Sequence, residues 1–162
     1  MIRSDMTRRS ILALGGAALL TVRLPGRAHA QTGTAGAISV MKDANCGCCA
    51  DWVDILRANG FDVDVTNVDP VTLRQYKIDS GLPAGVISCH TATVQGYVVE
   101  GHVPVADIRR LLDERPDAIG LAVPGMPYGS PGMGPETERD AYDVLLIKAD
   151  GTTEIFSRYA SA

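Results

Sequence analysis

Three of the chain's four cysteines lie in a single run of four residues, Cys46-Gly47-Cys48-Cys49. A short apolar stretch, 37–41, precedes this run, and residues 48–59 carry apolar side chains at helical spacing. The run therefore falls where a predicted strand meets the N-terminus of a predicted helix. Thiolates are favoured there because the helix dipole is positive at its N-terminus. Any fold of this chain has to accommodate three sulfurs at one strand–helix junction.

The chain up to residue 115 alternates predicted strands and helices. After the first strand and helix, the patterns predict a strand over 61–65, a helix starting at Asp69-Pro70, strands over 84–94 and 96–100, and a helix over 105–115. A hairpin over 142–148 and 152–159 follows, across Asp150-Gly151. This order predicts an α/β fold with a thioredoxin-like core and a C-terminal β-hairpin. By analogy with that fold, we expect Pro83 to be a cis-proline that faces the cysteine pair.

Residues 1–30 have the features of a cleavable signal peptide. An apolar run over 11–22 follows a basic start and precedes the small-residue site Ala28-His29-Ala30. Thr7-Arg8-Arg9-Ser10 resembles a twin-arginine export signal, with an ordinary secretory signal as the alternative. We therefore expect one mature domain over 31–162, located in a bacterial periplasm.

The charge of the chain excludes some partner classes. The full chain has a formal net charge of −4, and the loss of residues 1–30 would remove five arginines. We expect no nucleic-acid partner, because no basic stripe remains to bind phosphates. We also expect no stable membrane insertion after signal cleavage, because no other segment is apolar enough.

Residues 120–139 form a long stretch with four prolines, which we predict to be a loop too irregular for a strand or helix. The triplet Pro-Gly-Met occurs in it twice, ending at Met126 and at Met133. Such a loop can fold over a site and present thioether sulfur. We expect Met126 and Met133 to be metal ligands, and Met41 to belong to the core. The alternative is a linker in which Met126 fills an apolar gap.

The cysteines favour a thiophilic metal, most of all copper. Cu(I) prefers thiolate and thioether ligands, whereas zinc rarely binds methionine. Cys46, Cys48 and Cys49 are too close in sequence to chelate one ion without strain, so thiolates that bridge several Cu(I) ions are expected. Cys89 can join from the neighbouring third strand. The alternative is a Cys46–Cys49 disulfide with Cys48 as a bystander.

Two histidines are further candidate ligands. His90 follows Cys89, so the two side chains would point to opposite faces of an extended strand unless the strand bends or ends there. His102 follows Gly101, where a loop can aim it at the site. Glu100 is a candidate to orient His102, because metal-bound histidines commonly donate to a carboxylate.

Several ordered blocks carry a family resemblance over about residues 37–160. These blocks are Cys-Gly-Cys-Cys at 46–49, Ser-Cys-His-Thr-Ala at 88–92, Gly-Tyr at 96–97, Glu-Gly-His-Val-Pro at 100–104 and Gly-Leu-Ala-Val-Pro-Gly-Met-Pro at 120–127. They resemble the small periplasmic domain-of-unknown-function family that includes CopG-type copper-resistance proteins. The resemblance implies a thioredoxin-like core, copper binding through cysteine, methionine and histidine, and a role in copper tolerance.

The resulting hypothesis is a periplasmic copper-binding protein whose partners are copper ions and other periplasmic copper-handling proteins. It would store copper, pass it on, or cycle it between Cu(I) and Cu(II). An alternative is a thiol–disulfide oxidoreductase with Cys46 as nucleophile and Cys49 as resolving thiol. An iron–sulfur protein is a third, weaker alternative, because four cysteines suffice for a cluster.

Overall fold

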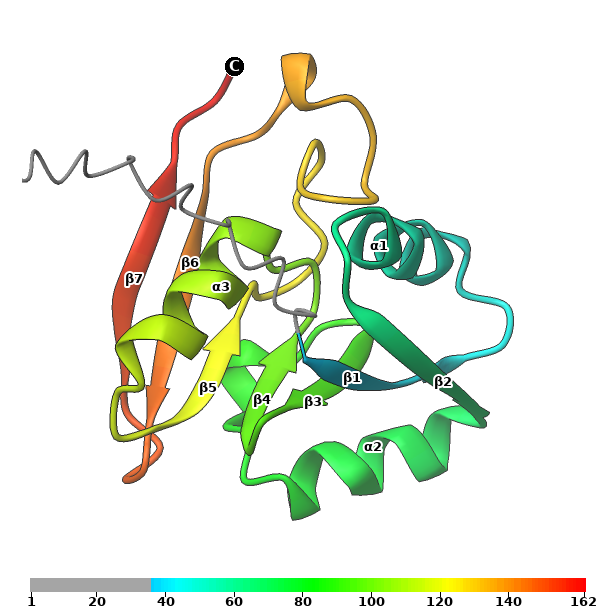
Figure 1. Ribbon diagram of the computed structural model, residues 1–162, viewed down its shortest axis with the longest axis vertical. Helices are drawn as coiled ribbons and strands as arrows, with labels where there is room; N and C mark the ends of the chain where they lie inside the picture. Colours follow the sequence, from blue (N-terminus) through cyan, green and yellow to red (C-terminus); the bar gives the residue numbers. More distant parts are fainter. Residues whose placement is uncertain (1–35) are drawn as a thin grey trace, which may run out of the picture. The chain divides into compact units, whose positions relative to one another are not determined.

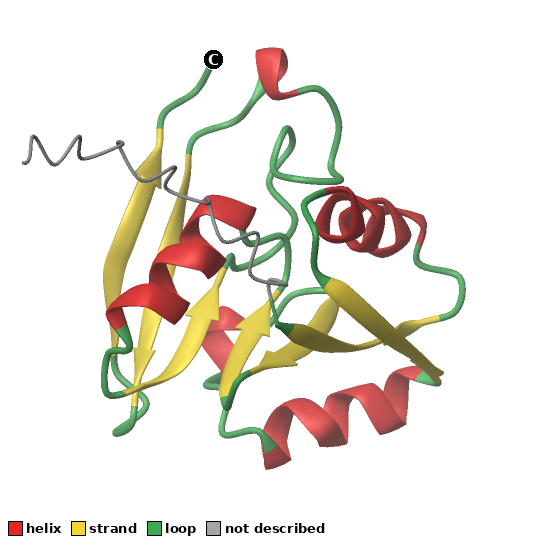
Figure 2. Cartoon of the chain, in the orientation of Figure 1, coloured by secondary structure: helices red, strands yellow, loops and turns green. Residues whose placement is uncertain are grey.

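The computed structural model describes residues 36–162, which form one mixed α/β sheet structure (Figures 1 and 2). The seven strands of this region are β1 (Ala37–Asp43), β2 (Asp62–Val68), β3 (His90–Val94), β4 (Tyr97–Glu100), β5 (Ala118–Ala122), β6 (Tyr142–Lys148) and β7 (Thr153–Tyr159). The helices are α1 (Gly47–Ala58), α2 (Pro70–Asp79) and α3 (Val105–Glu114), with short 3₁₀ turns over Ala84–Val86 and Glu136–Glu138. None of the helices in the described region is long and apolar enough to cross a membrane. The signal peptide predicted for residues 1–30 lies outside the described residues.

The sheet order is β2-β1-β3-β4-β5-β6-β7. β1 pairs with β2 in parallel and with β3 antiparallel, so the chain returns through helix α1 between β1 and β2. Helix α2 lies on the opposite face of these strands from α1 (Figure 1). The predicted α/β class and C-terminal hairpin are confirmed. The narrower assignment as thioredoxin-like stays a prediction.

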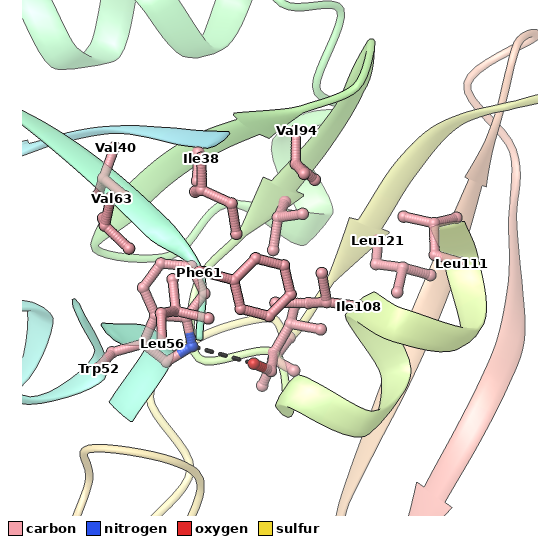
Figure 3. Packing of buried hydrophobic residues seen from close by; sticks show 14 of the residues in the cluster. Ile38, Val40, Trp52, Leu56, Phe61, Val63, Val94, Ile108, Leu111 and Leu121 are labelled. Carbon is pink, nitrogen blue, oxygen red and sulfur yellow. Dashed lines mark hydrogen bonds between the residues drawn. The ribbon is translucent and has the colours of Figure 1, made fainter. Parts of the chain in front are cut away.

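The main core lies between the sheet and helices α1 and α3 (Figure 3). Trp52 and Leu56 of α1 and Ile108 of α3 are fully buried there, as the helical spacing of apolar residues requires. The indole Nε1 of Trp52 donates to the carbonyl oxygen of Val103 at 2.9 Å. This bond fixes the first turns of α1 beside the segment that enters α3.

Two predictions around the third strand are wrong. Residues 84–86 form a 3₁₀ turn, and β3 begins only at His90. The apolar run that suggested a longer strand is divided by Gly85, and only its buried member Val86 packs into the second apolar cluster. The peptide bond before Pro83 is trans, because the described residues hold no cis peptide bond, and Pro83 starts the 3₁₀ turn. The expected cis-proline is therefore absent.

The prediction that the stretch from 120 is all loop is also wrong. Residues 118–122 form β5, a central strand between β4 and β6. Gly120 interrupts the apolar pattern by which this strand could have been recognised in the sequence. Glycine is needed there because an added Cβ would collide with the carbonyl oxygen of Val98 on β4. The fully buried Leu121 and Ala122 then continue the strand into the core. The irregular segment starts only after this strand and runs to β6.

Candidate metal centre

The cysteine run lies at the junction of β1 and α1, as predicted. Cys46 is the N-cap residue of α1, and Cys48 and Cys49 lie in its first turn. Cys46 and Cys49 form a disulfide, whereas Cys48 has a free thiol. The Cys48 sulfur is 3.5 Å from the sulfur of Cys46. The Cys46–Cys49 disulfide was the alternative to metal binding that the sequence left open. The two linked sulfurs become thiolates only after reduction.

Cys89 reaches the same place from the segment before β3. Because the strand begins at His90, Cys89 is outside it, and the two neighbouring side chains are not forced to opposite faces. The Cys89 sulfur is 3.3 Å from Nδ1 of His90 and 3.1 Å from Nε2 of His102. Both histidines are fully buried. The backbone therefore brings a thiol and two imidazoles together from two separate segments.

Cys89 is common to two groups of potential ligands. The sulfurs of the four cysteines all lie within 4.8 Å of one another. The Cys89 sulfur and one nitrogen from each of His90 and His102 also lie within 4.8 Å of one another. The four cysteines and both histidines predicted from the sequence thus meet in one continuous cluster.

The protons in this cluster follow from its hydrogen bonds. Nδ1 of His102 must be protonated, because its partner at 2.7 Å is the carbonyl oxygen of Pro131, which only accepts. In the neutral ring, Nε2 of His102 then accepts from the Cys89 thiol, whose sulfur accepts from Nδ1 of His90. Nε2 of His90 is buried without a partner. In this tautomer the lone pair of His90 is on Nε2, whereas Nδ1 faces Cys89, so binding copper beside Cys89 through Nδ1 would require the other tautomer.

The electrostatics keep these groups uncharged near neutral pH. Burial, together with the neighbouring Cys48 sulfur, raises the pKa of the Cys89 thiol to about 11. Burial lowers the pKa of His90 well below its ordinary value, and the nearby charges of His102 and Lys77 act in the same direction. Burial also lowers the pKa of His102, although the bond to Pro131 opposes this effect. A cation that binds here meets neutral imidazoles, and it must displace the thiol proton.

The loop after β5 closes over the cluster. The carbonyl oxygen of Pro131 holds the ring of His102. Gly132 packs so tightly on α1 that an added Cβ would lie 2.8 Å from the backbone nitrogen of Trp52. Met133 is half-buried in the turn that starts at Ser130, whose carbonyl accepts from the Met133 amide at 2.8 Å. Met126 is 55% exposed. The loop therefore covers the site as a lid, with Met133 half-buried and Met126 mostly exposed.

The residue that orients His102 was not predicted correctly. Glu100 does not contact His102; its carboxylate instead accepts from Lys77, Thr91 and the Ser88 amide. The carbonyl oxygen of Pro131 orients the ring. A backbone carbonyl leaves no signal in a sequence, because every residue has one, so this role could be found only from the structure.

A cleft beside Cys89 connects the cluster to solvent. It lies between α2 and the segment 82–89, has a volume of about 650 Å³ and is mostly apolar. Leu73 and Lys77 of α2 form part of one wall, and Ile87 and Cys89 form part of the other. Cys89 therefore borders a cleft whose other wall is formed by α2, away from the lid.

Comparisons with known proteins give one family-model match and two solved structures. The model, described as a protein of unknown function, DUF411, matches residues 86–133, which include Cys89 and both histidines. A structure named copper resistance protein copG, Form 1, is 45% identical, with a TM-score of 0.72, and the alignment covers 78% of this chain and 98% of that one. Form 2 is 47% identical, with a TM-score of 0.71, 76% of this chain and 98% of that one. The search of curated proteins found no match.

Proposed function

The chain belongs to the CopG-type copper-resistance family, and we propose that it binds copper ions at the junction of β1, α1 and β3. The proposed ligands are Cys46, Cys48, Cys49, Cys89, His90, His102, Met126 and Met133. The observation that carries the proposal is the convergence of four cysteine sulfurs within 4.8 Å of one another, with Cys89 also shared by two buried imidazoles. Soft sulfur with imidazole nitrogen is a donor set that suits copper.

The oxidation state of the cysteines determines which ligands are available. With the Cys46–Cys49 disulfide in place, Cys48 and Cys89 are the two free thiols. After reduction, four thiolates can bridge several Cu(I) ions, and we propose that this reduced form holds more than one copper. Imidazole ligands tolerate Cu(II), so mixed ligation allows the ion to cycle between its two oxidation states.

The methionines are the least constrained part of the ligand set. The lid that carries them is tied to the site through His102 and Gly132, and we propose that it presents a thioether to the copper. Leucine at Met126 or at Met133 should weaken Cu(I) binding. Met41, half-buried on β1, offers a matched control, because Met41→Leu changes a methionine outside the lid.

The proposed setting is the periplasm, after export directed by residues 1–30. There the protein would store copper, pass it to other periplasmic copper-handling proteins or change its oxidation state, and so support copper tolerance. The similarity to proteins named for copper resistance supports this role.

The proposal is tested by titrating the reduced chain 31–162 with Cu(I), without oxygen, against a chromophoric chelator. We expect more than one tightly bound copper per chain, and loss of this binding when all four cysteines are replaced by serine. Thr66→Ser on the edge strand β2 is a control that should leave the titration unchanged. If the cysteine-free variant bound as much copper as the wild type, the assignment would be wrong.

The Cys46–Cys49 disulfide favours a second candidate function, a thiol–disulfide oxidoreductase. In the reduced protein the Cys46 thiolate would attack a substrate disulfide and release one substrate thiolate. The Cys49 thiolate would then attack the mixed disulfide at Cys46, release the second substrate thiolate and re-form the Cys46–Cys49 bond. Reduction of insulin disulfides by the metal-free reduced protein, lost in Cys46→Ser and kept in Cys89→Ser, would support this activity. No reduction above the uncatalysed rate would exclude it for that substrate.

A further inference from the structure

The protein contains a buried ion pair, Lys77–Glu100, that the copper proposal does not use. The ammonium of Lys77 on α2 is 2.7 Å from the carboxylate of Glu100 at the end of β4, and both side chains are almost fully buried. Thr91 accepts from Lys77 at 2.8 Å and donates to Glu100 at 2.6 Å. Removing two charges from water has a desolvation cost that can exceed the attraction between them, so such a pair is weak evidence for a role in stability alone.

Glu100 Oε1 makes a second hydrogen bond, to the segment that carries Cys89 of the proposed metal centre. This oxygen accepts from the backbone amide of Ser88 at 2.6 Å. Ser88 directly precedes Cys89, and Glu100 itself is two residues before His102. One carboxylate therefore joins the two segments that supply the thiol and the imidazole 3.1 Å apart.

Ser88 is held from its other side as well. Its hydroxyl donates to the carbonyl oxygen of Gly125 in the lid. Gly101, at φ +71°, allows this close approach, because a Cβ there would lie 2.6 Å from the Ser88 Cβ. The backbone before Cys89 is thus fixed between the Glu100 carboxylate and the lid.

We propose that Glu100 is a positioning residue for Cys89: through the Ser88 amide it holds the thiol beside His102, so that both can bind one copper ion. Lys77 pairs with this carboxylate at 2.7 Å, and the bond from the Ser88 amide to a carboxylate is of the charge-assisted kind, which is roughly twice as strong as a neutral one. The inference rests on the proposed function, because it concerns the same copper site, but its geometric part concerns the metal-free protein.

The test compares two double variants of nearly equal size. Lys77→Met/Glu100→Gln and Lys77→Met/Glu100→Leu both remove the charges, and both should fold, because neutral replacement of a buried pair is commonly tolerated. Only glutamine keeps an oxygen for the Ser88 amide. Thr91→Val is the control for a lost hydrogen bond elsewhere in the same network.

Copper affinity is the first measurement. We expect the Leu double variant to bind Cu(I) about tenfold to a hundredfold more weakly than the wild type. The Gln double variant and Thr91→Val should stay close to the wild type. Equal affinities of the two double variants, or an equal loss in Thr91→Val, would overturn the inference.

The second measurement needs no metal. In a Cys48→Ser background with the disulfide intact, Cys89 is the one free thiol among the described residues. We expect iodoacetamide to modify Cys89 several-fold faster in the Leu double variant than in the Gln double variant, because the segment is released. Equal rates would refute the positioning role. If the wild type failed to bind copper, this rate would still test the geometry, so the two proposals can fail separately.

Discussion

Gly132→Ala should separate the lid from the metal centre. Gly132 has φ +84°, and an alanine Cβ would lie 2.8 Å from the backbone nitrogen of Trp52 and 2.9 Å from the carbonyl oxygen of Cys48. The left-handed backbone costs about 1–2 kcal/mol for a residue with a Cβ. Relieving the contact with α1 adds about 1–3 kcal/mol, the usual cost of overpacking. We therefore expect a loss of about 2–5 kcal/mol in the free energy of unfolding.

The displacement of the lid that Gly132→Ala causes should also weaken copper binding. Pro131 precedes Gly132 and holds Nδ1 of His102 at 2.7 Å, so a displaced lid releases the ring from the orientation that presents Nε2 to Cys89. Loss of such a partner commonly lowers metal affinity by about tenfold to a hundredfold. Urea unfolding followed by circular dichroism measures the stability, and chelator competition measures the Cu(I) affinity.

Gly151→Ala, in the turn between β6 and β7, is the matched control outside the lid. Gly151 has φ +79°, but a Cβ there would meet nothing within 4 Å. This variant should lose only the backbone part, about 1–2 kcal/mol, and should bind copper like the wild type. If Gly132→Ala and Gly151→Ala gave the same stability and the same copper affinity, the lid would not act through its contact with α1.

Three further predictions concern other parts of the chain. Lys77→Met should destabilise the fold by about 3–5 kcal/mol, because it leaves the Glu100 carboxylate buried without its cation, and adding Glu100→Leu should restore much of the loss in urea unfolding. A single variant as stable as the wild type would contradict this account. The metal-free protein should lose stability as the pH falls through 6.5, because the native-state pKa values of His90 and His102 are lowered and the unfolded chain binds more protons. The slope approaches about 1.4 kcal/mol per pH unit for each histidine, and a stability that is flat from pH 7 to 5 would refute it. Met126→Leu should lower Cu(I) affinity with little change in unfolding midpoint, because the side chain is 55% exposed, and unchanged affinity would remove it from the ligand set.

Much of the fold could be predicted because its elements carry local signals. Asp69 caps α2 by accepting from the amides of Val71 and Thr72, and the sequence pattern located this start correctly. The hairpin of β6 and β7 follows in the same way from its Asp-Gly turn. β5 was missed because a central strand of five residues with Gly120 in its middle has neither alternation nor β-branched side chains beyond Ile119.

The candidate site was predictable in its ligand types and less so in its bonding. Cysteine and histidine can be recognised as candidate ligands because they are rare and closely spaced in the sequence. The structure brings the four cysteines and the two histidines of the described region together. Their partners are a carbonyl of Pro131 and an amide of Ser88, which are backbone groups that any residue supplies. Glu100 was recognised as important for the wrong reason, because sequence proximity to His102 said nothing about which way a buried carboxylate points.

Trp52 gives this centre a built-in optical reporter. It is the chain's single tryptophan, and its ring packs against His90 with the centroids 4.4 Å apart and the ring planes tilted by 38°. Emission from an indole depends on what lies against its face, so the intrinsic fluorescence reports the charge and occupancy of one particular imidazole. Copper or a proton that binds at His90 would change the fluorescence of Trp52. The steps of metal loading could therefore be followed in time without attaching any dye.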